Sequence, residues 1–217
     1  MNEDGSGQLR LTTNPSADGQ PRWSPDASQL VFLRVEAGNQ NIFLMDADGS
    51  NVTQLTTHPS ADIWPDFSPD GSRIVFTSLR SGSSALYTMN TDGSELEKLT
   101  ADHINAGQAD WSPDGTRIAF VNNHCFECPP GRPHSDIFVL TVATGEVEQI
   151  THRFGNNLNP EWSPDGTRIA FWHAPGIQPF FNNTDIFVMN ADGTGLTNVT
   201  NTPNLREYVP DWGADPE

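Results

Sequence analysis

The sequence predicts an all-β fold built from a repeated unit of four antiparallel strands, and two observations carry this prediction. First, the ten residues WSPDGTRIAF occur at Trp111–Phe120 and again at Trp162–Phe171, with looser copies at Trp23–Phe32 and Phe67–Phe76. Second, the aromatic residue that opens each copy recurs after 44, 44, 51 and 50 residues, the last time at Trp212. A period in this range, with short strands between turn signals, is typical of a β-propeller whose blades are four-stranded sheets.

Each unit predicts the same succession of elements. A short inner strand ends at the aromatic residue, and an SPDG turn follows, in which Pro presets φ and Gly accepts a positive φ. Two strands come next, for example RIVFTS and ALYTMN. They are apolar on both faces, as strands packed between neighbouring blades should be. A second turn such as NTDGS leads into an outer strand such as LEKLT, whose alternation suits a half-exposed rim. No segment has a long helical period, so we expect almost no helix.

The repeat predicts one propeller domain over residues 1–217. We expect four complete blades at residues 17–60, 61–104, 105–155 and 156–204. We expect residues 1–16 to form the orphan outer strand of a preceding blade, because MNEDGSGQLRLT matches MNADGTGLTNVT near the end of the fourth blade. We expect residues 205–217 to form an orphan inner strand. Open strand edges pair readily with other chains. Either the chain is a piece of a longer propeller, or a neighbouring copy supplies the missing strands.

The composition limits the classes of partner. The chain has 28 Asp and Glu residues against 11 Lys and Arg residues, a formal charge of -17. Nucleic acids and anionic membranes both favour a basic face, so we expect neither as a partner. No apolar run approaches the ~20 residues that span a bilayer, and the start, MNEDGSGQLR, has no signal-peptide pattern. An acidic surface suits cationic partners or divalent metals, or it serves only to keep the protein in solution.

The recurring pattern W-SPDG-x-x-IAF, followed by DIFVMNADG and LT, resembles the TolB-like propellers, the PD40 branch of the WD40-like repeats. The resemblance extends over nearly the whole chain. Ala27 replaces the turn glycine in the first blade, and TVATGE replaces MNADG in the third. Proteins that resemble this one include the periplasmic TolB partner of an envelope lipoprotein, domains that gate serine peptidases and some polysaccharide lyases. The resemblance implies a location outside the cytoplasm, periplasmic or secreted, but a fold does not by itself determine function.

One face of the predicted propeller gathers the irregular loops. The second-to-third loops and the blade-to-blade connections share a face, here called the connection face, and all six histidines fall on it. His58, His103 and His152 lie in blade connections, and both insertions lengthen loops of this face. Loops that vary on a repeated scaffold commonly carry binding residues, so we expect the ligand or partner site here. Histidine also suits polar loops that have no such role.

The insertion NNHCFECPPGRPH contains His124, Cys125, Cys128 and His134. These four residues have the chemistry of a tetrahedral zinc site, although the usual paired spacing is absent. A local disulfide between Cys125 and Cys128 suits an exported protein better, and two free thiols are a further interpretation. A haem-attachment motif is excluded because Pro129 stands where a histidine is required.

The second insertion, WHAPGIQPFFNN, carries Trp172, Phe180 and Phe181 on a Pro- and Gly-rich stretch. If the three rings are exposed, they form a hot-spot patch for a protein or a sugar. If the loop folds over its own blade, the rings are buried. The sequence leaves both interpretations open.

Acidic residues directly precede four of the opening aromatic residues: Asp66, Asp110, Glu161 and Asp211. Arg22 takes this place in the first blade. Inner strands line the axis of a propeller, so the four acids predict an oxygen-rich ring suited to Ca²⁺. Neighbouring residues of a strand point to opposite sides, however, so the acids point elsewhere if the aromatic residues face the axis.

The leading functional hypothesis is a non-catalytic interaction propeller that binds a protein or peptide through the connection face. The sequence has no G-x-S-x-G nucleophile elbow. One alternative is a self-assembling structural protein, a ring or fibre completed by strands from neighbouring copies. Another is a metal-dependent carbohydrate lyase, in which Arg132 or Arg153 would meet an acidic sugar.

Overall fold

The computed structural model describes residues 6–122, 135–152, 155–175, 184–202, 205–207 and 210–212. These residues contain strands and turns, and no helix among them is long and apolar enough to cross a membrane. The strands are β1 (Ala17–Trp23), β2 (Gln29–Glu36), β3 (Asn39–Asp46), β4 (Thr53–Gln54), β5 (Asp62–Phe67), β6 (Arg73–Ser78), β7 (Ala85–Asn90), β8 (Glu97–Lys98), β9 (Ala106–Trp111), β10 (Arg117–Asn122), β11 (Asp136–Thr141), β12 (Glu146–Gln149), β13 (Asn156–Trp162), β14 (Arg168–Ala174), β15 (Asp185–Asn190) and β16 (Thr197–Asn198).

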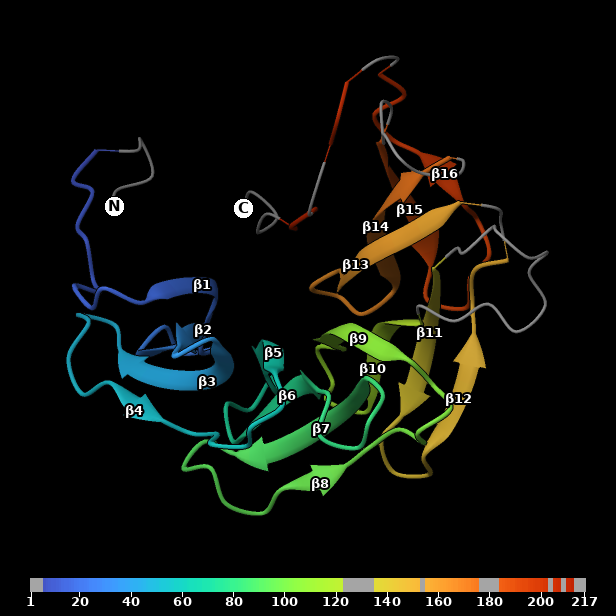
Figure 1. Cartoon of the computed structure of the whole chain (residues 1–217). Coiled ribbons are helices and arrows are strands. Elements are labelled where there is room, and N and C mark those ends of the chain that lie inside the picture. Colours follow the sequence, from blue (N-terminus) through green and yellow to red (C-terminus); the bar gives the residue numbers. More distant parts are fainter. Residues whose placement is uncertain are drawn as a thin grey trace.

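The strands form four antiparallel sheets of four strands each, in chain order: β1–β4, β5–β8, β9–β12 and β13–β16. The sheets follow one another along an arc, with β1, β5, β9 and β13 on its inner side (Figure 1). This arrangement confirms the predicted all-β propeller of four-stranded blades. The first and last sheets face each other across the open side of the arc (Figure 1). The blade boundaries drawn from the repeat stay predictions.

The core lies between neighbouring sheets. Three clusters of buried apolar residues join the first sheet to the second, the second to the third and the third to the fourth. The opening aromatic residues Phe67, Trp111 and Trp162 belong to these clusters and are 5%, 8% and 6% exposed. Trp23, on the outer face of the first sheet, is 55% exposed. Burial on both faces explains why the middle strands carry no apolar and polar alternation.

The SPDG turns are stabilised by the same hydrogen bonds in each blade. In the third blade, Ser112 Oγ donates to Asp114 Oδ1 over 2.6 Å and Thr116 N donates to the same oxygen over 3.0 Å. Gly115 has a φ of 69° in this turn, whereas Ala27 has a φ of 56° at the equivalent place in the first blade. A left-handed conformation costs a residue with a Cβ about 1–2 kcal/mol. These contacts assign the turns a structural role.

The outer strands are shorter than their sequence pattern predicts, because β4, β8 and β16 have two residues each. In the second blade, Leu86 N of the third strand donates to Thr100 Oγ1 over 2.9 Å instead of to a backbone oxygen. The same bond recurs at Thr56, Thr151 and Thr200. The threonine side chain therefore replaces backbone pairing at the point where each outer strand ends.

Candidate functional site: the axial pocket and the connection face

Every inner strand is interrupted by a β-bulge near its middle. The residues at the bulges have left-handed φ values: Gln20 at 52°, Trp64 at 51°, Gln108 at 52° and Asn159 at 50°. None is a glycine, so each costs on the order of 1–3 kcal/mol, and such strain concentrates at functional sites. A bulge also turns a side chain away from its regular direction. In this structure all four side chains line one pocket at the axis.

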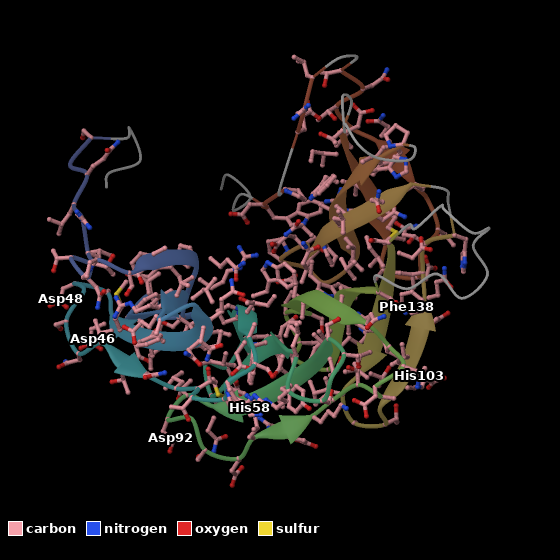
Figure 2. The ribbon with its side chains drawn as sticks, viewed as in Figure 1. Asp46, Asp48, His58, Asp92, His103 and Phe138 are labelled. Atoms are coloured by element: carbon pink, nitrogen blue, oxygen red, sulfur yellow. The ribbon has the colours of Figure 1, made fainter. Side chains whose placement is uncertain are left out.

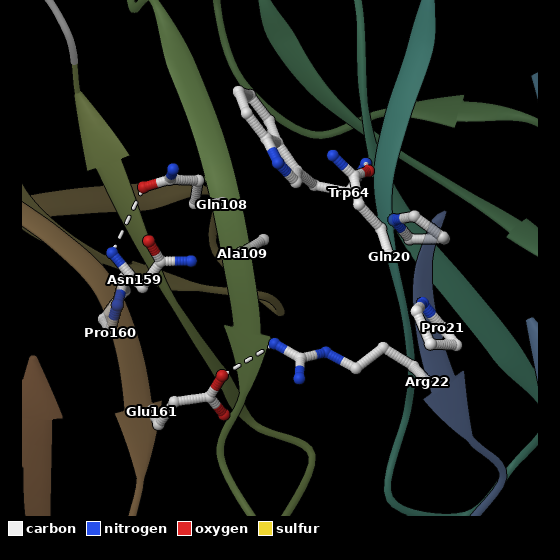
Figure 3. Close-up of a pocket in the computed structure, with 10 residues that line it drawn as sticks. Gln20, Pro21, Arg22, Trp64, Gln108, Ala109, Asn159, Pro160 and Glu161 are labelled. Carbon is white, nitrogen blue, oxygen red and sulfur yellow. Dashed lines mark hydrogen bonds and ion pairs between the residues drawn. The ribbon is translucent and has the colours of Figure 1, made fainter. Parts of the chain in front are cut away.

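This axial pocket has a volume of about 410 Å³, within the usual range for small-molecule sites. Figure 3 shows Gln108 and Asn159 on one side of it and Gln20 and Trp64 on the other. Its lining residues are Gln20, Pro21, Arg22, Trp64, Pro65, Gln108, Ala109, Asn159, Pro160 and Glu161. The pocket therefore combines amide groups, proline rings, an indole and an ion pair.

The amide oxygens in the pocket connect one element to the next. Gln20 Oε1 accepts from Trp64 N over 2.7 Å, and Gln108 Oε1 accepts from Asn159 N over 3.1 Å. Asn159 Oδ1 accepts from Trp172 Nε1 over 2.9 Å. Because an oxygen must face each N–H donor, these bonds also decide which end of each amide is the nitrogen.

Gln20, Trp64, Gln108 and Asn159 are not among the site residues predicted from the sequence. The signal was present, since each of them stands three residues before an opening aromatic residue. Their residue types differ from blade to blade, so these positions are equivalent in backbone conformation but not in sequence.

An ion pair crosses the axis beside this pocket. Arg22 Nη2 of β1 donates to Glu161 Oε1 of β13 over 2.7 Å, and Arg22 Nε lies 3.9 Å from Asp66 Oδ1. The Glu161 and Asp66 side chains are only 13% and 15% exposed. Arg22 and Glu161 belong to the first and the last sheet, so this contact bridges the open side of the arc (Figure 3).

Burial shifts the protonation of these acids toward the neutral form. It raises the pKa of Glu161 to about 7 and that of Asp66 to about 6, although the Arg22 charge opposes both shifts. Burial, and after it the Glu161 charge, raises the pKa of Asp110 well above its usual range. Perturbed acids in a cleft are one mark of a functional site, and they also occur in structural networks.

The acids also connect neighbouring blades. Asp110 Oδ2 accepts from the backbone N of Trp162, the opening residue of the next blade, over 2.6 Å. Asp66 accepts the equivalent bond from Trp111 N. Since Trp111 and Trp162 pack between sheets, the acids one residue earlier point the opposite way, toward the axis. The structure thereby resolves the direction that the sequence left open.

The convergence of the acids does not by itself make a metal site. Asp66, Asp110 and Glu161 lie around Arg22, and Asp211 is close enough for its charge to raise the pKa of Glu161. Among the residues that the structure describes, no three His, Cys, Asp or Glu side chains are placed to hold a metal ion together. The cation inside the cluster is the Arg22 guanidinium. Calcium binding by these acids stays a prediction without further support.

The predicted histidines of the connection face lie apart from one another. His58 and His103 are separated along the arc in Figure 2, and His152 follows the third sheet. His58 Nδ1 accepts from Ser60 N over 3.1 Å. His173 lies on β14, where its Nδ1 is 2.8 Å from Asn157 Oδ1. These histidines do not assemble into one common centre.

His58 does line a pocket of its own. This hollow of about 380 Å³ also includes Pro59, Arg80 and Leu96. The Arg80 guanidinium pairs with the buried Asp62 carboxylate over 3.0 Å, so it is held rigidly in place. We call this hollow the His58 pocket.

The structure distinguishes the two interpretations of Trp172. This residue lies within β14, is 7% exposed and donates its indole N–H to Asn159. The alternative in which the ring is buried therefore holds for Trp172. The other predicted residues of both insertions lie outside the described residues: Phe180, Phe181, His124, Cys125, Cys128, His134 and Arg132. Arg153, in the connection after the third blade, lies outside them as well.

Comparison with known proteins agrees with this architecture. A TolB protein of the Tol-Pal system from Francisella tularensis subsp. mediasiatica is 36% identical over 64 residues, which are 30% of this chain and 14% of that protein. The crystal structure of TolB from Acinetobacter baumannii superposes with a TM-score of 0.67 at 25% identity, covering 84% of this chain and 43% of that chain. The chain thus spans less than half the length of these relatives.

An enzyme shares the fold as well. An oligogalacturonate lyase in complex with manganese superposes with a TM-score of 0.66 at 20% identity, covering 87% of this chain and 55% of the lyase. At this identity the likeness shows the fold alone. Residues 5–128, more than half of the chain, match the PD40 family, described as the TolB beta propeller domain. The chain therefore belongs to the TolB β-propeller domain family.

Proposed function

We propose that this chain is a non-catalytic interaction propeller that binds a protein or peptide partner through its connection face, outside the cytoplasm. Its membership in the TolB propeller family carries the proposal, because the matched relatives are proteins of the Tol-Pal system. The chain covers only 14% of the first of these relatives, so its own partner has to be identified directly.

The connection face offers suitable chemistry for a partner. The His58 pocket extends from this face to the β7–β8 turn and joins an imidazole to the apolar Leu96 and the anchored Arg80. Leu79 projects from the β6–β7 loop of the same face and is 41% exposed. An apolar anchor surrounded by polar groups is the usual composition of a binding hot spot.

The test is site-specific photo-cross-linking. A photoreactive residue at Leu79 should capture a discrete partner in the cells that make this protein, and the same residue at Asp192, in the exposed β15–β16 turn of the fourth blade, should not. The combined replacement of His58, His103 and His152 by Ala should then weaken binding of the purified partner by at least tenfold. Equal capture from both positions, or unchanged affinity in the triple variant, would show that another surface is used.

The outer face of the first sheet favours a second candidate, self-association. Trp23, Leu30, Phe32 and Met45 line an apolar hollow of about 370 Å³. In the other blades the equivalent face packs against a preceding sheet, so the fourth sheet of a second copy is the matching occupant. Light scattering over a concentration series should show an oligomer. The Trp23→Ser variant should be monomeric, and the Leu79→Ser variant should still form the oligomer. A monomer at every concentration would remove this candidate.

The proposal that the protein is not an enzyme has its own test. Oligogalacturonate and neutral oligosaccharides should remain uncleaved in the presence of Mn²⁺ or Ca²⁺. Cleavage that EDTA abolishes and metal restores would favour the lyase alternative instead.

A further inference from the structure

The axial pocket contains three amide groups whose oxygens are already used. Gln20, Gln108 and Asn159 each accept an N–H bond through the side-chain oxygen. Within the described part of the chain, none of the three side-chain nitrogens donates a hydrogen bond. Since all three residues line the pocket and their oxygens bind the surrounding framework, their NH₂ groups are left for a ligand. The pocket therefore offers a set of hydrogen-bond donors contributed by three different blades.

Acceptors lie next to these donors. Glu161 lines the same pocket and receives one bond from Arg22, which leaves further lone pairs on its carboxylate. A ligand that fills the pocket has to accept from amide N–H groups and donate to a carboxylate within about 410 Å³. A hydroxyl group does both.

The remaining walls are apolar. Trp64, Pro21, Pro65 and Pro160 present ring surfaces to the pocket. The Trp64 indole packs over Gly107, where an added Cβ would come within 3.1 Å of its Cζ3 atom, so the ring is held in position. Flat apolar rings beside directed polar groups suit the C–H face of a pyranose ring, because such sites combine apolar contact with a few placed hydrogen bonds.

The local charge disfavours an anion. Within the described residues, the Arg22 guanidinium is the positive charge that neighbours Glu161, Asp66 and Asp110. A carboxylated sugar would add a further negative charge to a buried acidic cluster, and like charges at close range in a desolvated site repel strongly. Neutral ligands avoid this repulsion.

From these four features we propose that the axial pocket binds an uncharged saccharide unit, held by the NH₂ groups of Gln20, Gln108 and Asn159 and the carboxylate of Glu161. Nothing in this site requires the connection face, so the saccharide and the protein partner would occupy different surfaces. Each test can fail while the other succeeds.

The experiment is a calorimetric titration of the whole chain, with tryptophan fluorescence as a second readout because Trp64 lines the pocket. The probes are N-acetyl-D-glucosamine and D-glucose as neutral sugars, D-galacturonate as an acidic sugar and acetyl-dialanine amide as a peptide. At least one neutral sugar should bind saturably, and at least tenfold more tightly than galacturonate or the peptide.

Gln108→Glu tests the donors directly, because a carboxylate still accepts the Asn159 N–H bond but has no NH₂ group. It should weaken sugar binding at least tenfold, and Asn159→Asp should do the same by the same reasoning. Gln29→Glu adds an equal charge on the turn face, outside the pocket, and should leave the affinity unchanged. Circular dichroism confirms that each variant is folded.

The absence of saturable binding to either neutral sugar up to ~100 mM would overturn the proposal. Binding that survives both Gln108→Glu and Asn159→Asp in folded protein would place the sugar elsewhere. Tighter binding of the blocked dipeptide would assign the pocket to a peptide, and tighter binding of galacturonate would refute the charge argument.

Discussion

The same substitution at two buried threonines should change stability in opposite directions. Thr100 is 3% exposed, and its hydroxyl accepts the Leu86 N–H bond over 2.9 Å. Thr88 is 1% exposed, and its hydroxyl has no hydrogen-bond partner among the described residues. Valine keeps the shape of threonine and removes the hydroxyl. Thr100→Val leaves the buried Leu86 N–H group without a hydrogen-bond acceptor and should lower the free energy of unfolding by about 1–3 kcal/mol. Thr88→Val removes an unpaired buried hydroxyl and should raise it by about 1 kcal/mol.

The assay is equilibrium unfolding in guanidinium chloride, followed by tryptophan fluorescence, together with thermal unfolding. For a chain of this length, 1 kcal/mol corresponds to about 2–4 °C in Tm. Thr100→Val should therefore melt several degrees below the wild type, and Thr88→Val slightly above it. Thr100→Ser keeps the hydroxyl acceptor and loses only a methyl group, so most of the stability lost in Thr100→Val should return.

Two results would refute this reasoning. If Thr100→Val and Thr88→Val shifted stability equally, the hydrogen bond to Leu86 would contribute nothing beyond the volume of the side chain. If Thr100→Ser were as unstable as Thr100→Val, the methyl group and not the hydroxyl would matter. Either outcome would remove the threonine hydroxyl as the reason that the outer strands end early.

Further predictions concern pH and the turns. Burial raises the pKa of Glu161 to about 7 and of Asp66 to about 6, so both carboxyls keep their protons longer in the folded chain than in the unfolded one. The protonated carboxyls therefore contribute fully to the free energy of unfolding below pH ~4, and this contribution, roughly 3 kcal/mol for each group, is lost as pH rises to ~7. Glu161→Gln should reduce the loss in unfolding measurements across that window. The Ser112 hydrogen bond lowers the pKa of Asp114 to about 2, so the stability it contributes is lost as pH falls from about 4 to 2. A stability curve that kept rising between pH 4 and pH 8 would contradict the raised pKa values of Glu161 and Asp66. Ala27→Gly should raise the free energy of unfolding by about 1 kcal/mol, because alanine is left-handed there, and Gly115→Ala should lower it by a similar amount in the same denaturant titration.

The repeated features of the fold could be predicted from the sequence because they are local. The SPDG turn needs only a serine, an aspartate and a residue that accepts a left-handed φ within a few positions, as Ser112, Asp114 and Gly115 show. The double-sided apolar strands followed from the letters RIVF and ALYTM. The short outer strands did not follow, since a threonine hydroxyl that replaces a backbone partner looks, in sequence, like one more residue of an alternating strand.

The sequence by itself determined the blades, their order and the register of their turns, because each blade is specified within its own 44 to 51 residues. Only the tertiary structure decided what lies at the axis. Arg22 meets Glu161 across 139 residues, and Gln20, Gln108 and Asn159 share a pocket through bulges that turn each side chain inward. A strand pattern specifies that side chains alternate between the two faces of the sheet. It specifies neither which face turns toward the axis nor where a bulge reverses the alternation. Those directions depend on how whole sheets pack, and packing brings together residues that no local pattern connects.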